Sequence, residues 1–258
     1  CALVFLWFYP EQYKWLFYIA FFPGLAAISM TFFLKDRKTN SNITSGIPIK
    51  SSNPQILKSS NQNTGFFSYF RYWSKASKEY KFLVSGLLAF TLFNSSDAFL
   101  LFALKNQGMS DTRMIGFYIF YNLVYALLSY PLGAMADRIG LKPTIIVGLF
   151  IFSVVYLLFG FASTTMMFGL LFLLYGIYAA STEGISKALI SNMAKKTETA
   201  TAIGFYNSFA SIFALLASSL AGLLWLKAGM QTMFVISGLG VFCVVIYLLF
   251  FLGRKSSS

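Results

Sequence analysis

Long apolar segments without charge constrain this chain more than any other feature of its sequence. The stretch from Pro143 to Thr182 contains no Asp, Glu, Lys or Arg, and segments 114–136, 199–226 and 228–253 are also uncharged. A helix that crosses the hydrocarbon core of a bilayer needs about 20 predominantly apolar residues, so each of these segments is long enough. Because only helices and closed barrels satisfy backbone polar groups in lipid, we expect an all-α protein that spans the membrane several times.

The composition supports lipid, rather than water, as the solvent of this chain. Hydrophobic residues make up 57% of the sequence and charged residues 11%, against roughly 25% charged in ordinary soluble domains. The net charge of +12 comes from short basic clusters between apolar segments, which is the pattern of membrane topology. We therefore expect no nucleic-acid partner. With no histidine and only Cys1 and Cys243, we expect no metal, no cofactor and no disulfide framework.

Counting apolar segments gives the expected spans. Residues 1–9 are apolar from the first residue and are interpreted as the tail of a span, which a second span at 15–34 follows. The uncharged stretch after Pro143 is too long for one span, and we divide it at the polar residues 162–165. Six spans are then predicted after the first two segments, at 82–104, 114–136, 144–162, 166–190, 199–226 and 228–253.

A different kind of segment separates the second span from the following six. Residues 39–65 are rich in Ser, Asn, Gln and Gly, and no acidic residue occurs between Arg37 and Lys78. This composition predicts a flexible linker on the membrane surface. Aromatic residues accompany Arg71 in the segment 66–73, a mixture that favours a short helix at the membrane interface.

Lysine and arginine residues predict the orientation, because they accumulate in cytoplasmic loops. The loops on one side of the predicted membrane hold few of them, Lys14, Lys105, Arg113 and Lys227. The linker, the alternate loops and the C-terminus hold most of the others and are therefore expected to be cytoplasmic: Lys35, Arg37, Lys38, Lys50, Lys58, Arg71, Lys75, Lys78, Lys81, Arg138, Lys142, Lys195, Lys196, Arg254 and Lys255.

A short motif follows the segment 114–136. The sequence from Gly133 to Pro143 reads Gly-Ala-Met-Ala-Asp-Arg-Ile-Gly-Leu-Lys-Pro. It resembles the cytoplasmic loop motif of the major facilitator superfamily, Gly-x-x-x-Asp-Arg-x-Gly-Arg-Lys/Arg, and departs from it at Leu141. The residues that match the motif are Gly133, Asp137, Arg138, Gly140 and Lys142.

The resemblance implies a domain organisation. Members of that family have two six-helix halves joined by a long cytoplasmic linker. Residues 1–35 would be the end of the N-terminal half (the tail of span five and span six), 36–78 the linker, and 79–255 the C-terminal six-helix bundle. The motif would then be the second-half copy, between spans eight and nine. Residues 199–206 similarly resemble the start of the family's eleventh span.

The motif residues have a physical role that fits a conformational latch. Gly140 permits a positive φ in a tight reversal between two helices. Asp137 can face the positive N-terminus of a neighbouring helix, and Arg138 can hold a carboxylate in fork geometry. Such contacts can form and break when two helix bundles rock against each other. The family's partner for this copy, the start of the fifth span, is expected to lie in the missing part of the N-terminal half.

Asp97 is the ionisable residue most deeply placed in a predicted span. It closes the polar sequence Asn94-Ser-Ser-Asp97. Because ionisable groups are costly inside a bilayer, it is a functional candidate, either for proton coupling or for solute binding, together with Asn94. A structural hydrogen bond to a neighbouring helix is an equal alternative.

Glu183 and Lys187 form a second candidate pair. Their i, i+4 spacing, with the glutamate N-terminal to the lysine, favours an intrahelical ion pair. They could line the cavity and separate when a solute or proton arrives. The alternative is a self-neutralised pair near the cytoplasmic interface, with Lys187 extending towards water.

Polar-tipped side chains complete the candidate list. Tyr118, Tyr121, Asn122, Tyr125 and Ser129 share one face of a predicted helix. Such groups bind solutes in central cavities, and they also hold helices together or mark membrane interfaces. The cavity role is favoured most for Asn122 and Tyr125. The candidates taken from this and the later spans are Tyr121, Asn122, Tyr125, Tyr178 and Asn207.

These features together predict secondary active transport of a small solute by alternating access. The partners expected besides the solute are the lipid bilayer, protons and the missing half of the transporter. A multi-pass protein of the plasma (inner) membrane is expected, with the linker and C-terminus in the cytoplasm. No enzymatic activity is expected, because histidine and clustered acids are absent. The alternative function is a membrane-embedded receptor or enzyme without transport activity.

Overall fold

The computed structural model describes Phe21, Leu25, Ser29 and residues 72–253. The chain divides into two units, 1–64 and 65–258, and the helices described below belong to the second. The predictions for residues 1–20 and for the linker up to residue 71 lie outside the described residues.

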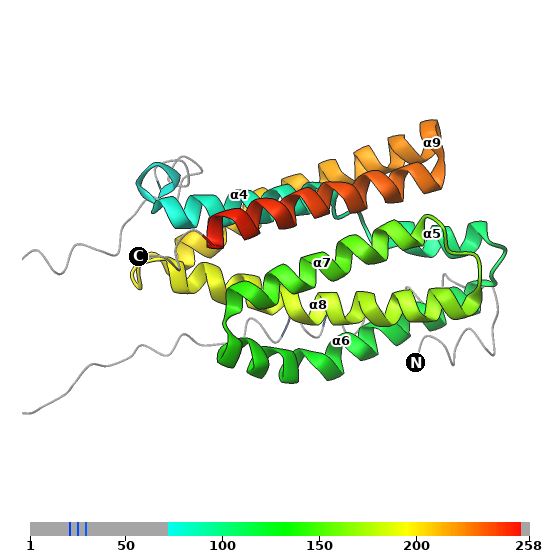
Figure 1. Ribbon diagram of the computed structural model, residues 1–258, viewed down its shortest axis with the longest axis horizontal. Helices are drawn as coiled ribbons and strands as arrows, with labels where there is room; N and C mark the ends of the chain where they lie inside the picture. The colour runs from blue at the N-terminus through cyan, green and yellow to red at the C-terminus, as the bar shows by residue number, and fades with distance from the viewer. Residues whose placement is uncertain (1–20, 22–24, 26–28, 30–71, 254–258) are drawn as a thin grey trace, which may run out of the picture. The chain divides into compact units, whose positions relative to one another are not determined.

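Regular structure in the described part is entirely helical, and its labelled elements (Figure 1) are α4 (Lys78–Phe93), α5 (Ala98–Asn106), α6 (Asp111–Ile139), α7 (Leu141–Phe159), α8 (Thr165–Met193) and α9 (Thr199–Gly253).

These helices make six passes in residues 78–253. Five stretches are long and apolar enough to cross a membrane, and α4 and α5 together form the first. The last stretch belongs to α9, which turns back at Gly229, where φ is 85° and ψ is 167°. Because that residue is not helical, α9 makes two passes. The described part therefore agrees with the six predicted spans.

The first pass is broken rather than continuous. Helix α4 ends at Phe93 and α5 begins at Ala98. Residues 94–97 are polar, and such side chains compete with the helical hydrogen bonds of the backbone. Here the Ser96 Oγ accepts a hydrogen bond from the Ala98 amide at 3.3 Å. The break brings Asn94 and Asp97 out of the regular helix.

The loops define two ends of the bundle. The α6–α7 turn at Gly140, the α8–α9 connection at 194–198 and the start of α4 lie at one end, which we call the motif end. The α5–α6 and α7–α8 connections and the Gly229 turn lie at the other, the far end (Figure 1).

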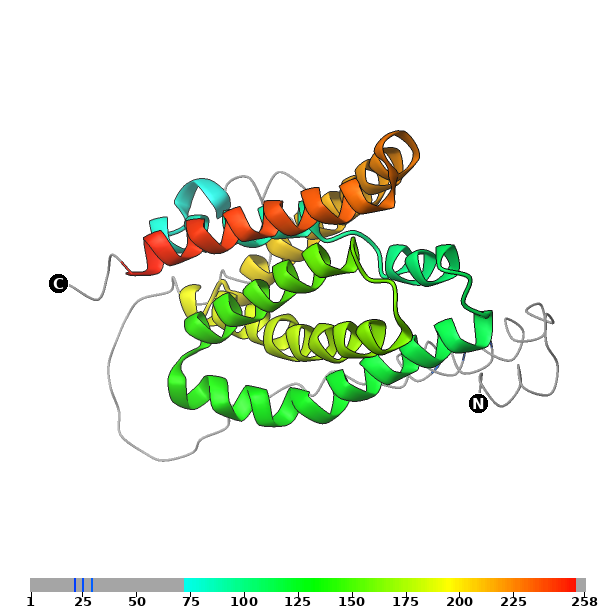
Figure 2. The same cartoon turned by 45° about the vertical axis from the view of Figure 1, so that its right-hand side comes forward.

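The helices pack as two groups around α8 and α9. Helix α7 contacts both α8 and α9, α6 lies along α8, and α4 lies along α9 (Figure 2). A Cβ on Gly176 of α8 would meet the Val124 Cγ1 at 2.7 Å and the Tyr121 carbonyl oxygen at 2.9 Å. The α6–α8 contact therefore depends on a residue without a side chain, as in many membrane helix pairs.

Aromatic side chains join the start of α4 to α9 at the motif end. Trp73 stacks on Phe205 with ring centroids 5.1 Å apart. The Tyr80 hydroxyl donates a hydrogen bond of 2.9 Å to the Ala202 carbonyl oxygen. Of the aromatic segment predicted at the membrane interface, Tyr72 and Trp73 are described, and both contact Tyr80. These contacts fix the entry of the chain into the bundle.

Candidate functional site

Asp97 lies at the helix break, and two neighbouring helices satisfy its carboxylate. The Tyr121 hydroxyl of α6 donates to Oδ2 at 2.5 Å. The Tyr175 hydroxyl of α8 donates to Oδ1 at 2.6 Å. Both tyrosines are buried. Hydrogen bonds to a charged group are short and strong, so this cluster ties the start of α5 to α6 and α8.

Asn94, at the other end of the break, is less completely satisfied. Its Nδ2 donates to the Tyr178 hydroxyl at 3.4 Å. Its Oδ1 is buried without a hydrogen-bond partner. The neighbouring Ser95 hydroxyl lies 3.4 Å from that of Tyr156. An unsatisfied buried acceptor of this kind is costly in a native protein and therefore calls for an explanation.

Asn94 also borders a cavity of about 430 Å³, which we call the central cavity. Four passes contribute to its wall, from α4, α7, α8 and the first half of α9. Of the side chains that the sequence singled out, it gathers Asn94, Tyr178, Glu183, Lys187 and Asn207. Asp97 does not line it. The remaining lining residues are Leu87, Phe90, Thr91, Leu149, Thr182, Ser186, Tyr206, Ala210, Ser211 and Ala214.

Sequence reasoning did not single out four hydroxyl-bearing residues of this wall. Thr182 and Ser186 follow Tyr178 at intervals of four residues, so the face of α8 that carries Tyr178 continues through them. Extending the helical spacing from Tyr178 could have found both. Thr91 and Ser211 lie on α4 and α9 among apolar residues, and nothing in their sequence surroundings marks them as cavity residues.

Glu183 and Lys187 are both exposed on the cavity face of α8. The predicted intrahelical ion pair is not formed, because no ammonium–carboxylate contact within 4.0 Å joins these two side chains in the described part of the chain. Glu183 instead has the Tyr125 side chain of α6 among its electrostatic neighbours. Neither charge is neutralised by the other, and Glu183 has the Tyr125 hydroxyl as a hydrogen-bonding neighbour.

Tyr125 does not line the central cavity. It borders a smaller cavity of about 240 Å³ between α6 and α8, which we call the motif cavity. Asp137 and Gly133 of the loop motif line it too, as does Gly184. Asn122 lines neither cavity, and its Nδ2 donates to the Tyr118 carbonyl oxygen at 2.8 Å.

The loop motif forms the reversal between α6 and α7. Gly140 has φ 106°, so the expected positive φ is present. Its amide donates to the Ala136 carbonyl oxygen at 2.9 Å, and its own carbonyl oxygen accepts from the Thr144 hydroxyl at 2.9 Å. Asp137 and Arg138 are exposed at this end of the bundle. Lys142 is half-buried in the first turn of α7.

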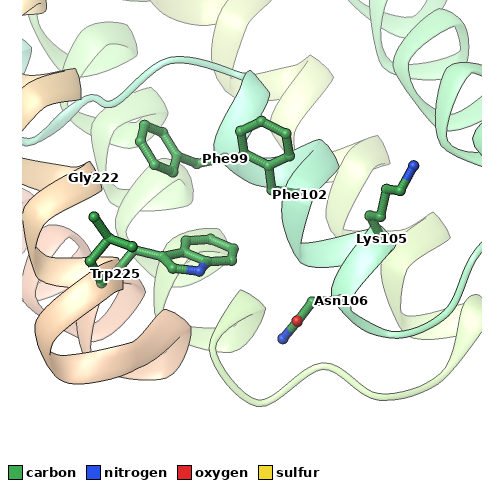
Figure 3. Close-up of a pocket in the computed structure, with 7 residues that line it drawn as sticks. Phe99, Phe102, Lys105, Asn106, Gly222 and Trp225 are labelled. Carbon is green, nitrogen blue, oxygen red and sulfur yellow. The ribbon is translucent and has the colours of Figure 1, made fainter.

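A third cavity, of about 420 Å³, opens at the far end between α5 and α9. Figure 3 shows its aromatic wall, in which Phe99, Phe102 and Trp225 approach one another. Lys105 borders it, but its ammonium group pairs with Asp111 at 2.8 Å. This wall is apolar, whereas the central cavity offers opposite charges and several hydroxyl groups. The central cavity is therefore the better candidate for binding a polar solute.

Comparison with known proteins identifies the family. The sequence model of the Major Facilitator Superfamily matches residues 82–258. The chain belongs to the major facilitator superfamily. An uncharacterised MFS-type transporter of Methanocaldococcus jannaschii is 35% identical over 154 residues, which are 57% of this chain and 39% of that protein. The chain thus spans less than half the length of this relative.

The family match and the helices confirm two predictions from the sequence. The loop motif correctly indicated the superfamily, and the apolar segments correctly indicated an all-α, multi-pass membrane protein. The name of the Methanocaldococcus jannaschii relative describes that protein as a transporter.

Proposed function

We propose that the six passes of residues 78–253 form one half of a secondary transporter that moves a small solute by alternating access. The observation that carries this proposal is the central cavity, which places Glu183, Lys187 and several hydroxyl groups inside an otherwise apolar bundle. A second half, packed against the face that exposes Glu183 and Lys187, would enclose the solute. Polar groups converging on a cavity in a membrane bundle are typical of solute sites.

Two carboxylates are candidates for proton coupling, and their surroundings differ. Asp97 already accepts two tyrosine hydroxyls and does not line the central cavity. Glu183 lines the cavity and is exposed. A coupling carboxylate must reach both solute and water during the cycle, so we assign proton exchange to Glu183 and a structural role to Asp97.

The loop motif is proposed to act as a latch. Asp137 and Arg138 are exposed at the motif end, where the start of a fifth span from the other half would dock. Asp137 also lines the motif cavity next to Gly184 of α8, the neighbour of Glu183. A contact made there in one conformation can be transmitted along α8 to the central cavity.

The protein is proposed to lie in the plasma membrane with its motif end facing the cytoplasm. The distribution of basic residues supports this orientation. Arg138 and Lys142 follow α6, and Lys195 and Lys196 follow α8. At the far end the corresponding residues are few, as the positive-inside rule requires.

Counterflow in proteoliposomes tests the transport proposal. The complete protein, reconstituted into vesicles preloaded with unlabelled solute, should accumulate the same radiolabelled solute transiently for at least one member of a polar panel. Glu183→Gln should abolish any acceleration by an imposed proton gradient, whereas Glu198→Gln, on the exposed 194–198 connection, should not. Saturable solute binding without counterflow of any bound solute would favour the receptor alternative.

A further inference from the structure

The central cavity contains one acid and one base that do not neutralise each other. Among its lining residues Glu183 is the acid and Lys187 the base. They stand one turn apart on α8, and no contact within 4.0 Å joins their charged groups in the described residues. Cβ atoms at this spacing lie about 5–6 Å apart, so the two charges face the same volume from neighbouring positions.

Once the proposed second half covers the exposed Glu183 and Lys187, this pair of separated charges favours a solute that is complementary to both. A solute with only one charge would pair with one side chain and leave the other desolvated and unpaired, which is unfavourable. A neutral solute would leave both unpaired. A zwitterion satisfies both, with its ammonium group at Glu183 and its carboxylate at Lys187.

The remaining lining residues fit the uncharged part of such a molecule. Leu87, Phe90, Leu149, Ala210 and Ala214 contribute the apolar part of the cavity wall. Ser186 and Ser211 add hydroxyl oxygens to the wall, and such oxygens can accept hydrogen bonds from an ammonium group. The cavity volume of about 430 Å³ lies at the small end of the range for ligand sites.

We infer that the central cavity binds a small zwitterion of the amino-acid type, its ammonium group held by Glu183 and its carboxylate by Lys187. This inference rests on the proposed transport function for its biological role, but the binding that it predicts can be measured separately.

Matched derivatives test the inference with the complete protein in detergent. Isothermal titration would compare each standard amino acid, β-alanine and γ-aminobutyrate with its N-acetyl and amide derivatives, which remove the ammonium and the carboxylate charge respectively. At least one zwitterion should bind, and both of its derivatives should bind about 10-fold more weakly or worse, as expected for loss of a charge-assisted hydrogen bond. Absence of zwitterion binding, or equal binding of the derivatives, would overturn the inference.

Reciprocal variants assign each charge to its side chain. Glu183→Gln should weaken binding of the zwitterion until its affinity equals that of the N-acetyl derivative. Lys187→Gln should weaken binding of the zwitterion until its affinity equals that of the amide derivative. The double exchange of Glu183→Lys with Lys187→Glu should restore zwitterion binding in the reversed orientation. Glu198→Gln and Lys195→Gln, exposed and outside the cavity, are the matched controls and should leave the affinity unchanged.

The structural alternative gives a different result. If Glu183 and Lys187 only stabilised α8, the single variants would lower the melting temperature. They would not change the affinity for the zwitterion relative to that for either derivative. That outcome, in variants that remain monodisperse and helical, would also overturn the inference.

Binding and transport can fail independently. Selective zwitterion binding without counterflow would support the inference and contradict the proposed transport function. Counterflow of a sugar or another uncharged solute, with no zwitterion bound, would support transport and overturn the inference.

Discussion

A carboxylate within a membrane-length pass needs hydrogen-bond donors, because lipid supplies none. Asp97 obtains them from Tyr121 and Tyr175, on two different helices. The cost of placing the charge there is offset by contacts that also hold α5, α6 and α8 together. This geometry explains the position of Asp97 without any role in solute binding.

Asp97→Asn should therefore lower stability. An amide offers one acceptor oxygen where the carboxylate offers two, and its NH2 group would face a tyrosine hydroxyl. Loss of one hydrogen bond to a charged group costs about 1.5–3 kcal/mol. Unfolding of the detergent-solubilised protein, followed by circular dichroism, would measure the loss.

Asp111→Asn provides the control for this carboxylate. Asp111 pairs with Lys105, and both side chains are exposed, so its loss should cost at most about 1 kcal/mol. If Asp97→Asn lowered the stability no more than Asp111→Asn but abolished proton-driven uptake, Asp97 would be a coupling residue instead.

At the scale of single residues, the sequence predicts the positions of polar groups better than it predicts their hydrogen-bond and ion-pair partners. Asp97 and Asn94 were recognisable because they interrupt an apolar segment. The two tyrosines that bind Asp97 come from helices that only the tertiary fold brings together. The ion pair expected from the spacing of Glu183 and Lys187 is absent because local spacing permits a contact but does not enforce one against competing surroundings.

Helix α8 contains a direct test of close packing at the level of elements. A Cβ at Gly176 would meet the Tyr121 carbonyl oxygen at 2.9 Å, and that backbone atom belongs to α6 and cannot rotate away. Gly176→Ala should therefore separate α6 from α8 and destabilise the protein by about 1–3 kcal/mol. Thermal unfolding in detergent would measure the effect.

Gly184→Ala is the matched substitution two turns further along α8. A Cβ there meets nothing within 4 Å, and alanine is favoured over glycine within a helix by about 0.5–1 kcal/mol. We expect unchanged or slightly raised stability. Equal destabilisation by both substitutions would contradict the close-contact argument at Gly176, because helix propensity alone would raise the stability of both variants.

The turn between α6 and α7 depends on Gly140 for a different reason. Its φ of 106° is rarely accessible to residues with a Cβ. Gly140→Ala should cost about 1–3 kcal/mol through backbone strain, whereas Gly133→Ala, a helical position with nothing within 4 Å of the new Cβ, should not. The two melting temperatures would decide this, and equal values would contradict the strain argument.

Elements were largely predictable from the sequence because lipid imposes a length on every apolar segment. The division at residues 162–165 agrees with α7 ending at Phe159 and α8 beginning at Thr165. The break at residues 94–97 was not predicted, since hydropathy alone does not distinguish a polar turn inside a pass from a polar side chain on a continuous helix. Its four consecutive polar residues are the signal that could have revealed it.

For the molecule as a whole, the two ends of the bundle differ in charge and therefore in the side of the membrane that each should occupy. The motif end holds Arg138, Lys142, Lys195 and Lys196. Because basic loops are retained in the cytoplasm, these residues predict an orientation in which the motif end faces the cytoplasm.

Cysteine labelling of intact cells measures this orientation. In a background in which every cysteine of the complete protein, Cys1 and Cys243 included, is replaced by serine, Ser163→Cys would mark the far end and Lys196→Cys the motif end, and both positions are exposed. We expect a membrane-impermeant maleimide to label position 163 in intact cells and position 196 only after permeabilisation. The reverse pattern would place the loop motif outside the cell. A latch in the cytoplasm would then be excluded. The inferred zwitterion site would not be affected, because it does not depend on the orientation in the membrane.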